Sequence, residues 1–452
     1  MPQEERSLSI STEMQIAGRL SQVVRCRTVS YDEDSLAEPF FELHALLKSL
    51  YPRLHQALRR EVVNGLSLLY TWQGTQPELP AVAFLAHQDV VPVVDGEAGW
   101  TYPAFSGAIA DGCIYGRGVI DMKSQLVALM EAVETLLQAG FQPRRTIYLA
   151  FGHDEETGGR QGARAIAALL KERGVRLEAL LDEGGAVAGG VAPGYGGPIA
   201  TIAMAEKSFA NVTLKAHARA GHASVPGRVT AIGRLSRAVL RLERRPMPAQ
   251  LEFVLPTIRA LLPHLPWPLR LVFGNLWLTG GLVRAVLAQS PLSNAMIRNT
   301  MAPTIVHGGY KLNILPESAS VSVNCRLLPG NTVEDLLAYI RKAVADDQVE
   351  VSLLDTSAPS KKPGSLDTPA YTALAVAIRK LYGDVPVCPT VISGSTDARY
   401  YEGICQNVYR FQPNCFDHPE DDRTHGIDER LPVAQLPVMA QFNAHVMQAW
   451  AG

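Results

Sequence analysis

Two adjacent carboxylates, Glu155 and Glu156, offer the clearest chemistry in this chain. The apolar run at residues 145–150 predicts a buried strand before them, and Gly158 and Gly159 free the backbone to turn after them. Neighbouring side chains on such a turn point in different directions, so one can bind a metal ion while the other acts as a base on a water molecule. A solvated acidic loop is the alternative, because acidic pairs are common in loops.

A histidine and an aspartate follow a second apolar run, at residues 81–86. His87 and Asp89 lie two apart, on the same side of an extended chain. An imidazole with a carboxylate beside it suits a metal ligand that a hydrogen-bonding partner holds in place. For this pair alone, a histidine that is hydrogen-bonded at the end of a strand is the alternative.

Further acids occupy comparable places along the chain. Asp121 precedes a helix expected at residues 124–139, where its ordinary role is to cap the helix. Asp182 and Glu183 follow a short strand expected at residues 177–181. The alternation of strands and helices predicts a doubly wound α/β domain, in which all these groups converge on one rim. Carboxylates together with imidazole suit zinc or a similar divalent ion.

A change of pattern near residue 207 predicts a second domain. Residues 210–218 alternate between apolar and polar, as a half-exposed antiparallel strand does. The elements expected after it complete a β-α-β-β-α-β count, typical of an α+β, ferredoxin-like domain: a helix at 231–242, strands at 310–315 and 319–326, a helix at 332–344 and a strand at 349–354. We therefore expect a catalytic domain formed by residues 1–206 and 357–452 around an inserted dimerisation or lid domain at residues 207–356.

The inserted domain carries an insertion of its own, a strongly apolar stretch at residues 247–304. Helices are expected within it around residues 261–277 and 282–301. A soluble chain rarely displays so much apolar surface without a use. We expect the stretch either to pack as a lid on the dimer side or to line a channel for an acyl chain.

Composition argues against several other classes. With 452 residues, 47% apolar and 19% charged, the chain has an ordinary globular balance, and its net charge of −2 gives no reason to expect nucleic acid or an anionic membrane as a partner. Six scattered cysteines without a C-x-x-C pair predict reduced thiols in the cytoplasm. We expect no secretory signal, because no basic segment leads into an apolar one, and no membrane span, because charges interrupt every long apolar run.

Seven ordered motifs resemble one known family, the co-catalytic dizinc metallopeptidases that include aminoacylase, carboxypeptidase G, acetylornithine deacetylase and succinyl-diaminopimelate desuccinylase. The motifs are H-x-D-V-V-P from His87, G-R-G-x-x-D-M-K from Gly116, D-E-E-x-G-G from Asp154, D-E-G-G from Asp182, G-H-A-S from Gly221, S-T-D-A-R from Ser395 and H-G-x-D-E-R from His425. Within that family, residues 291–295 and 302–304 look most like the carboxypeptidase S branch, which also holds the N-fatty-acyl-amino-acid hydrolases.

The resemblance implies two zinc ions per subunit, for which cobalt or manganese can substitute, that share a bridging water. The implied ligands are His87 and Asp182 for one ion, Glu156 and His425 for the other, and Asp121 as the bridge between them. Glu183 is the alternative to Asp182, since relatives use either an aspartate or a glutamate there. The resemblance further implies Glu155 as the general base, Asp89 as the partner of His87, and a cis peptide bond after Asp121.

On the substrate side, the resemblance implies that His222 of the inserted domain reaches the active site of the other subunit in a homodimer. The residues implied to hold the substrate carboxylate and the scissile carbonyl are Asn313, Arg326, Gly394, Ser395, Thr396 and Arg399. The implied activity is hydrolysis of an amide bond next to a free carboxylate, in an N-acyl amino acid. A dipeptidase of the carboxypeptidase S type and a non-catalytic binding relative are the alternatives.

Overall fold

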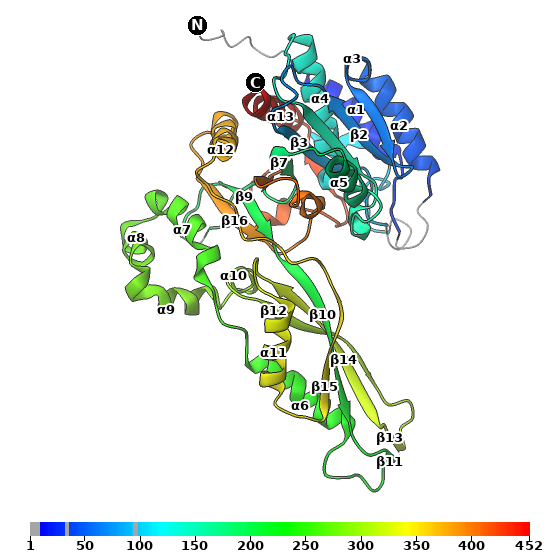
Figure 1. Cartoon of the computed structure of the whole chain (residues 1–452), viewed down its shortest axis with the longest axis vertical. Helices are drawn as coiled ribbons and strands as arrows, with labels where there is room; N and C mark the ends of the chain where they lie inside the picture. Colours follow the sequence, from blue (N-terminus) through cyan, green and yellow to red (C-terminus); the bar gives the residue numbers. More distant parts are fainter. Residues whose placement is uncertain (1–9, 32–35, 94–97, 193) are drawn as a thin grey trace. The chain divides into compact units, whose positions relative to one another are not determined.

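The computed structural model of the chain describes residues 10–31, 36–93, 98–192 and 194–452. The chain divides into two compact units (Figure 1): unit 1 comprises Met1–Met204, Gly364–Pro389 and Thr396–Gly452, and unit 2 comprises Ala205–Pro363 and Thr390–Ser395. We expected the inserted domain to span residues 207–356, whereas unit 2 spans residues 205–363 and also includes residues 390–395. The expectation of no secretory signal rests partly on residues 1–9, which lie outside the described residues.

Unit 1 is built on a mixed sheet whose central strands run parallel. Strand β3 pairs in parallel with β6 on one side and with β7 on the other, and β7 pairs in parallel with β17. Within the described residues the order is β1 (Arg59–Val63), β2 (Ser67–Trp72), β6 (Ile147–Gly152), β3 (Ala81–His87), β7 (Leu177–Asp182), β17 (Val408–Arg410), β9 (Ile199–Glu206), β8 (Val187–Ala188) and β18 (Cys415–Phe416), with β16 (Val387–Ile392) pairing with β9.

Helices cover both faces of this sheet, as the doubly wound prediction requires. Alternate residues of β3 enter two different cores because side chains of a strand alternate between its faces. Val82 and Phe84 pack in the core that α4 and α13 share, whereas Ala83 and Leu85 pack in the core lined by α5. The helices of unit 1 are α1 (Glu13–Arg25), α2 (Glu38–Leu50), α3 (Pro52–Ala57), α4 (Ser124–Gln138), α5 (Ala163–Glu172), α12 (Pro369–Tyr382) and α13 (Gln435–Ala451).

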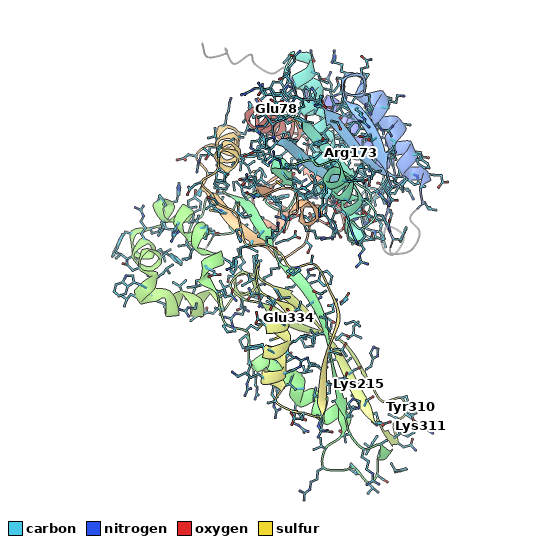
Figure 2. The ribbon with its side chains drawn as sticks, viewed as in Figure 1. Glu78, Arg173, Lys215, Tyr310, Lys311 and Glu334 are labelled. Atoms are coloured by element: carbon cyan, nitrogen blue, oxygen red, sulfur yellow. The ribbon has the colours of Figure 1, made fainter. Side chains whose placement is uncertain are left out.

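Short elements complete unit 1. A small sheet pairs β4 (Ala108–Ala110), β5 (Cys113–Tyr115) and β19 (Arg430–Pro432), and brings the segment after His425 next to the one before Asp121. Just beyond the C-terminal end of α5, Arg173 (Figure 2) forms an ion pair with Glu61 of β1 at 2.7 Å.

Unit 2 has the strand and helix order predicted for the inserted domain. Its antiparallel sheet runs β12 (Thr300–Gly308), β14 (Ser318–Leu327), β10 (Ser208–His217) and β15 (Val349–Thr356), and Lys215 of β10 is marked in Figure 2. Helices α6 (Ala231–Arg244) and α11 (Val333–Val344) pack on one face of it, where β10 and β14 alternate buried and half-exposed residues. The second strand was predicted wrongly. It is β12, and of residues 310–315 only β13 (Ile314–Leu315) is extended, paired with β11 (Gly221–His222).

The apolar insertion is helical from residue 251 to 296, in shorter pieces than predicted. Prolines at or near the N-termini of several pieces break it up, because proline cannot continue a preceding helix. The pieces are α7 (Leu255–Leu261), α8 (Trp267–Gly274), α9 (Leu276–Leu287) and α10 (Pro291–Met296). The predicted end of the insertion at residue 304 is wrong, since residues 300–304 belong to β12.

Two further observations concern the whole described chain. All six cysteines are present as free thiols. Among the described residues, no helix has both the length and the apolar character needed to cross a membrane.

Candidate metal centre

Parallel strands of unit 1 bring the predicted acids and histidine to one edge of the sheet. His87 is the last residue of β3, Glu155 and Glu156 lie in the turn after β6, and Glu183 follows β7. Because β6 and β7 flank β3 in parallel, their carboxyl ends meet at the same edge. Asp121 joins them from the irregular turn that leads into α4, and its peptide bond to Met122 is cis, which confirms that expectation.

Asp121 lies between the two histidines. Its Oδ1 is 2.9 Å from His87 Nε2, and its Oδ2 is 3.0 Å from His425 Nε2. Each imidazole also faces a glutamate: His87 Nε2 lies 3.6 Å from Glu183 Oε1, and His425 Nε2 lies 3.2 Å from Glu156 Oε2. The five side chains therefore form two half-sites that share one aspartate.

Like charges crowd this edge of the sheet. Burial raises the pKa of Glu183 well above its usual range, and the neighbouring Asp121 raises it further. Burial likewise raises the pKa of Glu155, with Asp397, Asp121 and Glu156 adding to the effect. Several half-buried carboxylates that face one another in this way call for a compensating positive charge.

The histidines respond in the opposite direction. Burial by itself lowers the pKa of His87, but Glu183, Asp121 and Asp89 together hold it well above its usual value. Hydrogen bonding to Asp121 and Glu156 raises the pKa of His425 to about 10. The carboxylates that face each imidazole Nε2 thus favour positive charge at the position that a metal ion would take.

The donor set fits divalent metal ions. Ligand atoms of His87, Asp121 and Glu156 lie within 4.8 Å of one another, and so do those of His87, Glu155 and Glu183. Imidazole nitrogens and carboxylate oxygens are ligands that zinc accepts. A cation at each cluster would relieve the crowding of negative charge described above.

Asp89 contacts more of the centre than His87, the one partner predicted for it from the sequence. Its backbone oxygen lies 3.0 Å from His87 Nδ1, and its Oδ1 lies 3.5 Å from the same nitrogen, so it does orient that imidazole. Its carboxylate also accepts hydrogen bonds from the backbone N–H groups of Glu155 and Glu156, both at 3.1 Å. Asp89 therefore positions the histidine and the acidic turn at once.

Asp182, the favoured ligand in the sequence analysis, does not join the cluster. Its carboxylate accepts a hydrogen bond from the backbone N–H of Ala398 at 2.8 Å and is stabilised by Thr396. Glu183 faces His87 instead. Asp182 is the last residue of the buried strand β7, and Glu183 is the residue after it. Consecutive side chains along an extended chain point to opposite sides, so only one of these two acids can reach the cluster. We therefore propose Glu183, the alternative named from the sequence, as the ligand in place of Asp182.

Two residues that the sequence analysis left without a role hold the loops of the centre together. Glu429, fully buried, accepts hydrogen bonds from Arg117 Nη1 at 2.7 Å and from the backbone N–H groups of Gly118, Ile120 and Asp121. Arg117 Nη2 donates to the backbone oxygen of His425 at 3.0 Å. Both belong to quoted motifs, so the signal available in the sequence was an arginine in one ligand motif and a glutamate in another.

The predicted substrate residues are divided between the two units. In unit 1, Arg399 donates to the backbone oxygen of Gly158, at 2.7 Å, and stacks over Tyr400, so it lies against the turn that carries Glu155. The Thr396 hydroxyl accepts a hydrogen bond from Arg410 Nε at 3.0 Å beside Asp182.

The other predicted substrate residues lie in unit 2. Arg326 stacks over Phe209, the backbone oxygen of Asn313 accepts from Ala223, and His222 is exposed and hydrogen-bonded to Ser224. Gly394 and Ser395 also belong to this unit. Their part in substrate binding, like that of His222, stays a prediction.

The family model of peptidase family M20/M25/M40 matches residues 83–449. The chain is 35% identical to the N-fatty-acyl-amino acid synthase/hydrolase PM20D1 of Mus musculus, over 94% of this chain and 85% of that protein. It is 33% identical to a probable carboxypeptidase S-like protein of Dictyostelium discoideum (99% and 87% covered), and 30% identical to carboxypeptidase S of Saccharomyces cerevisiae (92% and 80% covered).

Among solved structures, an M20 family metallo-carboxypeptidase from Sulfolobus solfataricus shares the fold, with a TM-score of 0.67 at 16% identity over 98% of this chain and 100% of that one. The family match and the relatives cover nearly the whole chain, including every strand end that supplies the centre. The chain therefore belongs to peptidase family M20/M25/M40, a metallopeptidase family whose members use divalent metal ions.

Proposed function

We propose that the chain hydrolyses the amide bond of N-acyl amino acids, with two zinc ions held by five ligands, of which one is shared. His87 and Glu183 would bind one ion, His425 and Glu156 the other, and Asp121 both. The observation that carries the proposal is the position of Asp121, whose two oxygens lie 2.9 and 3.0 Å from the two histidines. Cobalt or manganese can take the place of zinc in such sites.

Bound divalent ions would supply positive charge that polarises the scissile carbonyl and lowers the pKa of a nearby water. Glu155 accepts the proton of the attacking water and returns it to the leaving amine, so that the products are a carboxylic acid and a free amino acid. Burial and the carboxylates around Glu155 raise its pKa, which suits a group that must both take and give a proton.

Arg399 would bind the free carboxylate of the amino-acid part through paired hydrogen bonds. Its contact with Gly158 supports this role, because that glycine closes the turn begun by Glu155. The preference for an acyl group rests on similarity to the mouse N-fatty-acyl-amino acid synthase/hydrolase. The relation to carboxypeptidase S keeps a dipeptide substrate as the alternative.

The decisive experiment compares Glu155→Gln with the wild type, both loaded with zinc. We expect the variant to retain its metal and to lose about 10²–10⁴-fold in kcat, because proton transfer alone is removed. Glu78→Gln, a change of the same kind at an exposed glutamate (Figure 2), should leave kcat unchanged. If Glu155→Gln loses metal instead, Glu155 is a ligand and the assignment of the base is wrong.

The substrate class is tested with N-acyl amino acids of rising chain length beside Gly-X and X-Gly dipeptides. Each buried methylene contributes about 0.8 kcal/mol, so kcat/KM should rise roughly three- to fourfold per carbon over a short range. A flat profile with good dipeptide turnover would favour the carboxypeptidase alternative. A zinc-loaded protein that turns over none of these substrates would favour a binding relative.

We further propose a cytoplasmic homodimer formed through unit 2, in which His222 acts on the partner's substrate. The exposure of His222 and the apolar residues Ile305 and Val306 on the edge strand β12 support this pairing. The six free thiols support a reducing compartment. Mixing His222→Ala with Glu155→Gln should restore activity, since each mixed dimer keeps one intact site. No recovery in proven heterodimers would refute action across the interface.

A further inference from the structure

The helical insertion of unit 2 carries an unusual distribution of charge. No aspartate or glutamate occurs between Glu252 and Glu317, although the chain as a whole has a net charge of −2. The charged residues of the helices in this stretch are arginines, and Arg259, Arg270 and Arg284 are all exposed. The near-neutral net charge of the whole chain therefore conceals a region whose charged residues are all basic. The expectation of no anionic membrane partner was based on that net charge alone.

Helices α8 and α9 pack against each other, and this packing leaves apolar side chains outside. Leu265, two residues before α8, and Val283 of α9 are buried. A short turn joins the helices and is held by Thr279, whose Oγ1 donates to the backbone oxygen of Val272 at 2.6 Å. Figure 1 shows α7, α8 and α9 as one group of green helices. The outward faces are thus fixed by packing and hydrogen bonds of the group itself.

The outward faces of these two helices are made of large apolar residues. Trp277 is 85% exposed and Trp267 is 72% exposed. On α9, Leu278, Leu282 and Val286 follow one another at intervals of four, so they lie on one face of the helix. We call the set formed by Trp267, Leu271, Trp277, Leu278, Leu282 and Val286 the tryptophan face.

We propose that the tryptophan face docks onto the surface of an anionic lipid bilayer, with the arginines of the same helices facing the headgroups. Tryptophan favours the boundary between headgroups and acyl chains, because its ring is apolar and its N–H remains hydrated. Exposed leucines and valine gain free energy by entering the same layer. Arginines, with no acidic residue nearby in sequence, complement negatively charged lipid headgroups.

The geometry favours a helix that lies in the interface rather than one that crosses it. Helix α9 has 12 residues, which corresponds to about 18 Å at 1.5 Å per residue, well short of the roughly 30 Å of a hydrocarbon core. Short helices that expose tryptophan and leucine side chains together with arginines can bind a membrane surface without crossing the bilayer. Docking would place the enzyme where amphiphilic molecules with acyl chains are concentrated.

The test is sedimentation of the full-length protein with vesicles of phosphatidylcholine alone or mixed with phosphatidylserine. Each arginine near an anionic surface strengthens binding about fivefold, so we expect partition onto mixed vesicles to exceed that onto neutral ones by more than about tenfold. Trp267→Ser combined with Trp277→Ser should lower partition onto mixed vesicles by at least about tenfold. Arg270→Gln combined with Arg284→Gln should remove most of the preference for the anionic lipid.

The matched control is Phe41→Ser, which removes an exposed aromatic residue from α2 of unit 1 and should leave partition unchanged. Turnover of a short, water-soluble N-acyl amino acid should be the same in the tryptophan variant as in the wild type, which shows that the variant is folded. No partition of the wild type, or equal partition of the tryptophan variant, would overturn the proposal. It would also be overturned if sedimentation velocity showed that the tryptophan face joins two copies of the chain and no vesicles bind.

Discussion

Replacement of Glu429 by glutamine should loosen the metal centre without removing a ligand. Each oxygen of the buried Glu429 carboxylate accepts two hydrogen bonds, and all four donors lie in the segment from Arg117 to Asp121. Glutamine has one acceptor oxygen and a donating amide group, so in either orientation two donors lose their acceptor. Leaving Arg117 buried without its charged partner costs about 3–5 kcal/mol of unfolding free energy.

The same change should weaken metal binding, because Arg117 and Glu429 hold the loops that carry Asp121 and His425. Loss of such supporting contacts typically lowers metal affinity about 10–100-fold. Competition with a chelator measures the affinity, and urea unfolding of the metal-free protein measures the stability.

The matched control is Glu61→Gln, which breaks the ion pair with Arg173 at 2.7 Å, where both side chains are partly exposed. An exposed pair contributes less than about 1 kcal/mol, and no metal ligand depends on this one. If Glu429→Gln and Glu61→Gln were indistinguishable in metal affinity and in urea midpoint, the role given to Glu429 would be refuted.

Two further predictions concern single carboxylates and one buried lysine. Glu183→Gln should lose one of the two metal ions, whereas Asp182→Asn should keep both; elemental analysis distinguishes the two, and the opposite pattern would restore Asp182 as the ligand. Burial, with Arg326 nearby, lowers the pKa of Lys207 to about 8, below its unfolded value of 10.5. Between these values only the unfolded chain holds the proton, so stability rises with pH by about 1.4 kcal/mol per unit in this window. Lys207→Met should lack this contribution, and thermal unfolding at pH 8 and pH 10 measures it; equal slopes would contradict the assignment.

Much of the catalytic unit follows from local pattern. Strand β3 reads as a continuous apolar run because both of its faces are buried, and the expected 81–86 agrees with the observed Ala81–His87 to one residue. The first polar residues after such strands must emerge at the edge of a parallel sheet, which is why His87 and Glu156 could be named as neighbours. The helix after Asp121 could also be predicted, since Gly140, two residues beyond its end at Gln138, takes the left-handed conformation that glycine favours.

Local pattern failed where long-range packing decides. Strand β12 was missed because it is an edge strand with mostly exposed residues, so no alternation of buried and exposed side chains marks it. The helices of the insertion were predicted to be longer than they are. Their outward faces are apolar as well, so the sequence shows no alternation of apolar and polar residues with the helical period that would mark where each helix begins and ends.

The sequence by itself determined which segments carry acids and histidines and that they meet at one sheet edge. It favoured Asp182 over Glu183 as the ligand, although adjacent carboxylates at a strand end differ only in the side to which each points. Only the tertiary structure decided between them: the backbone of Ala398, far away in sequence, binds Asp182, and His87 faces Glu183. The same holds for Glu429, whose partners lie more than three hundred residues earlier in the chain, so its burial and its charge pairing exist only once the fold has formed.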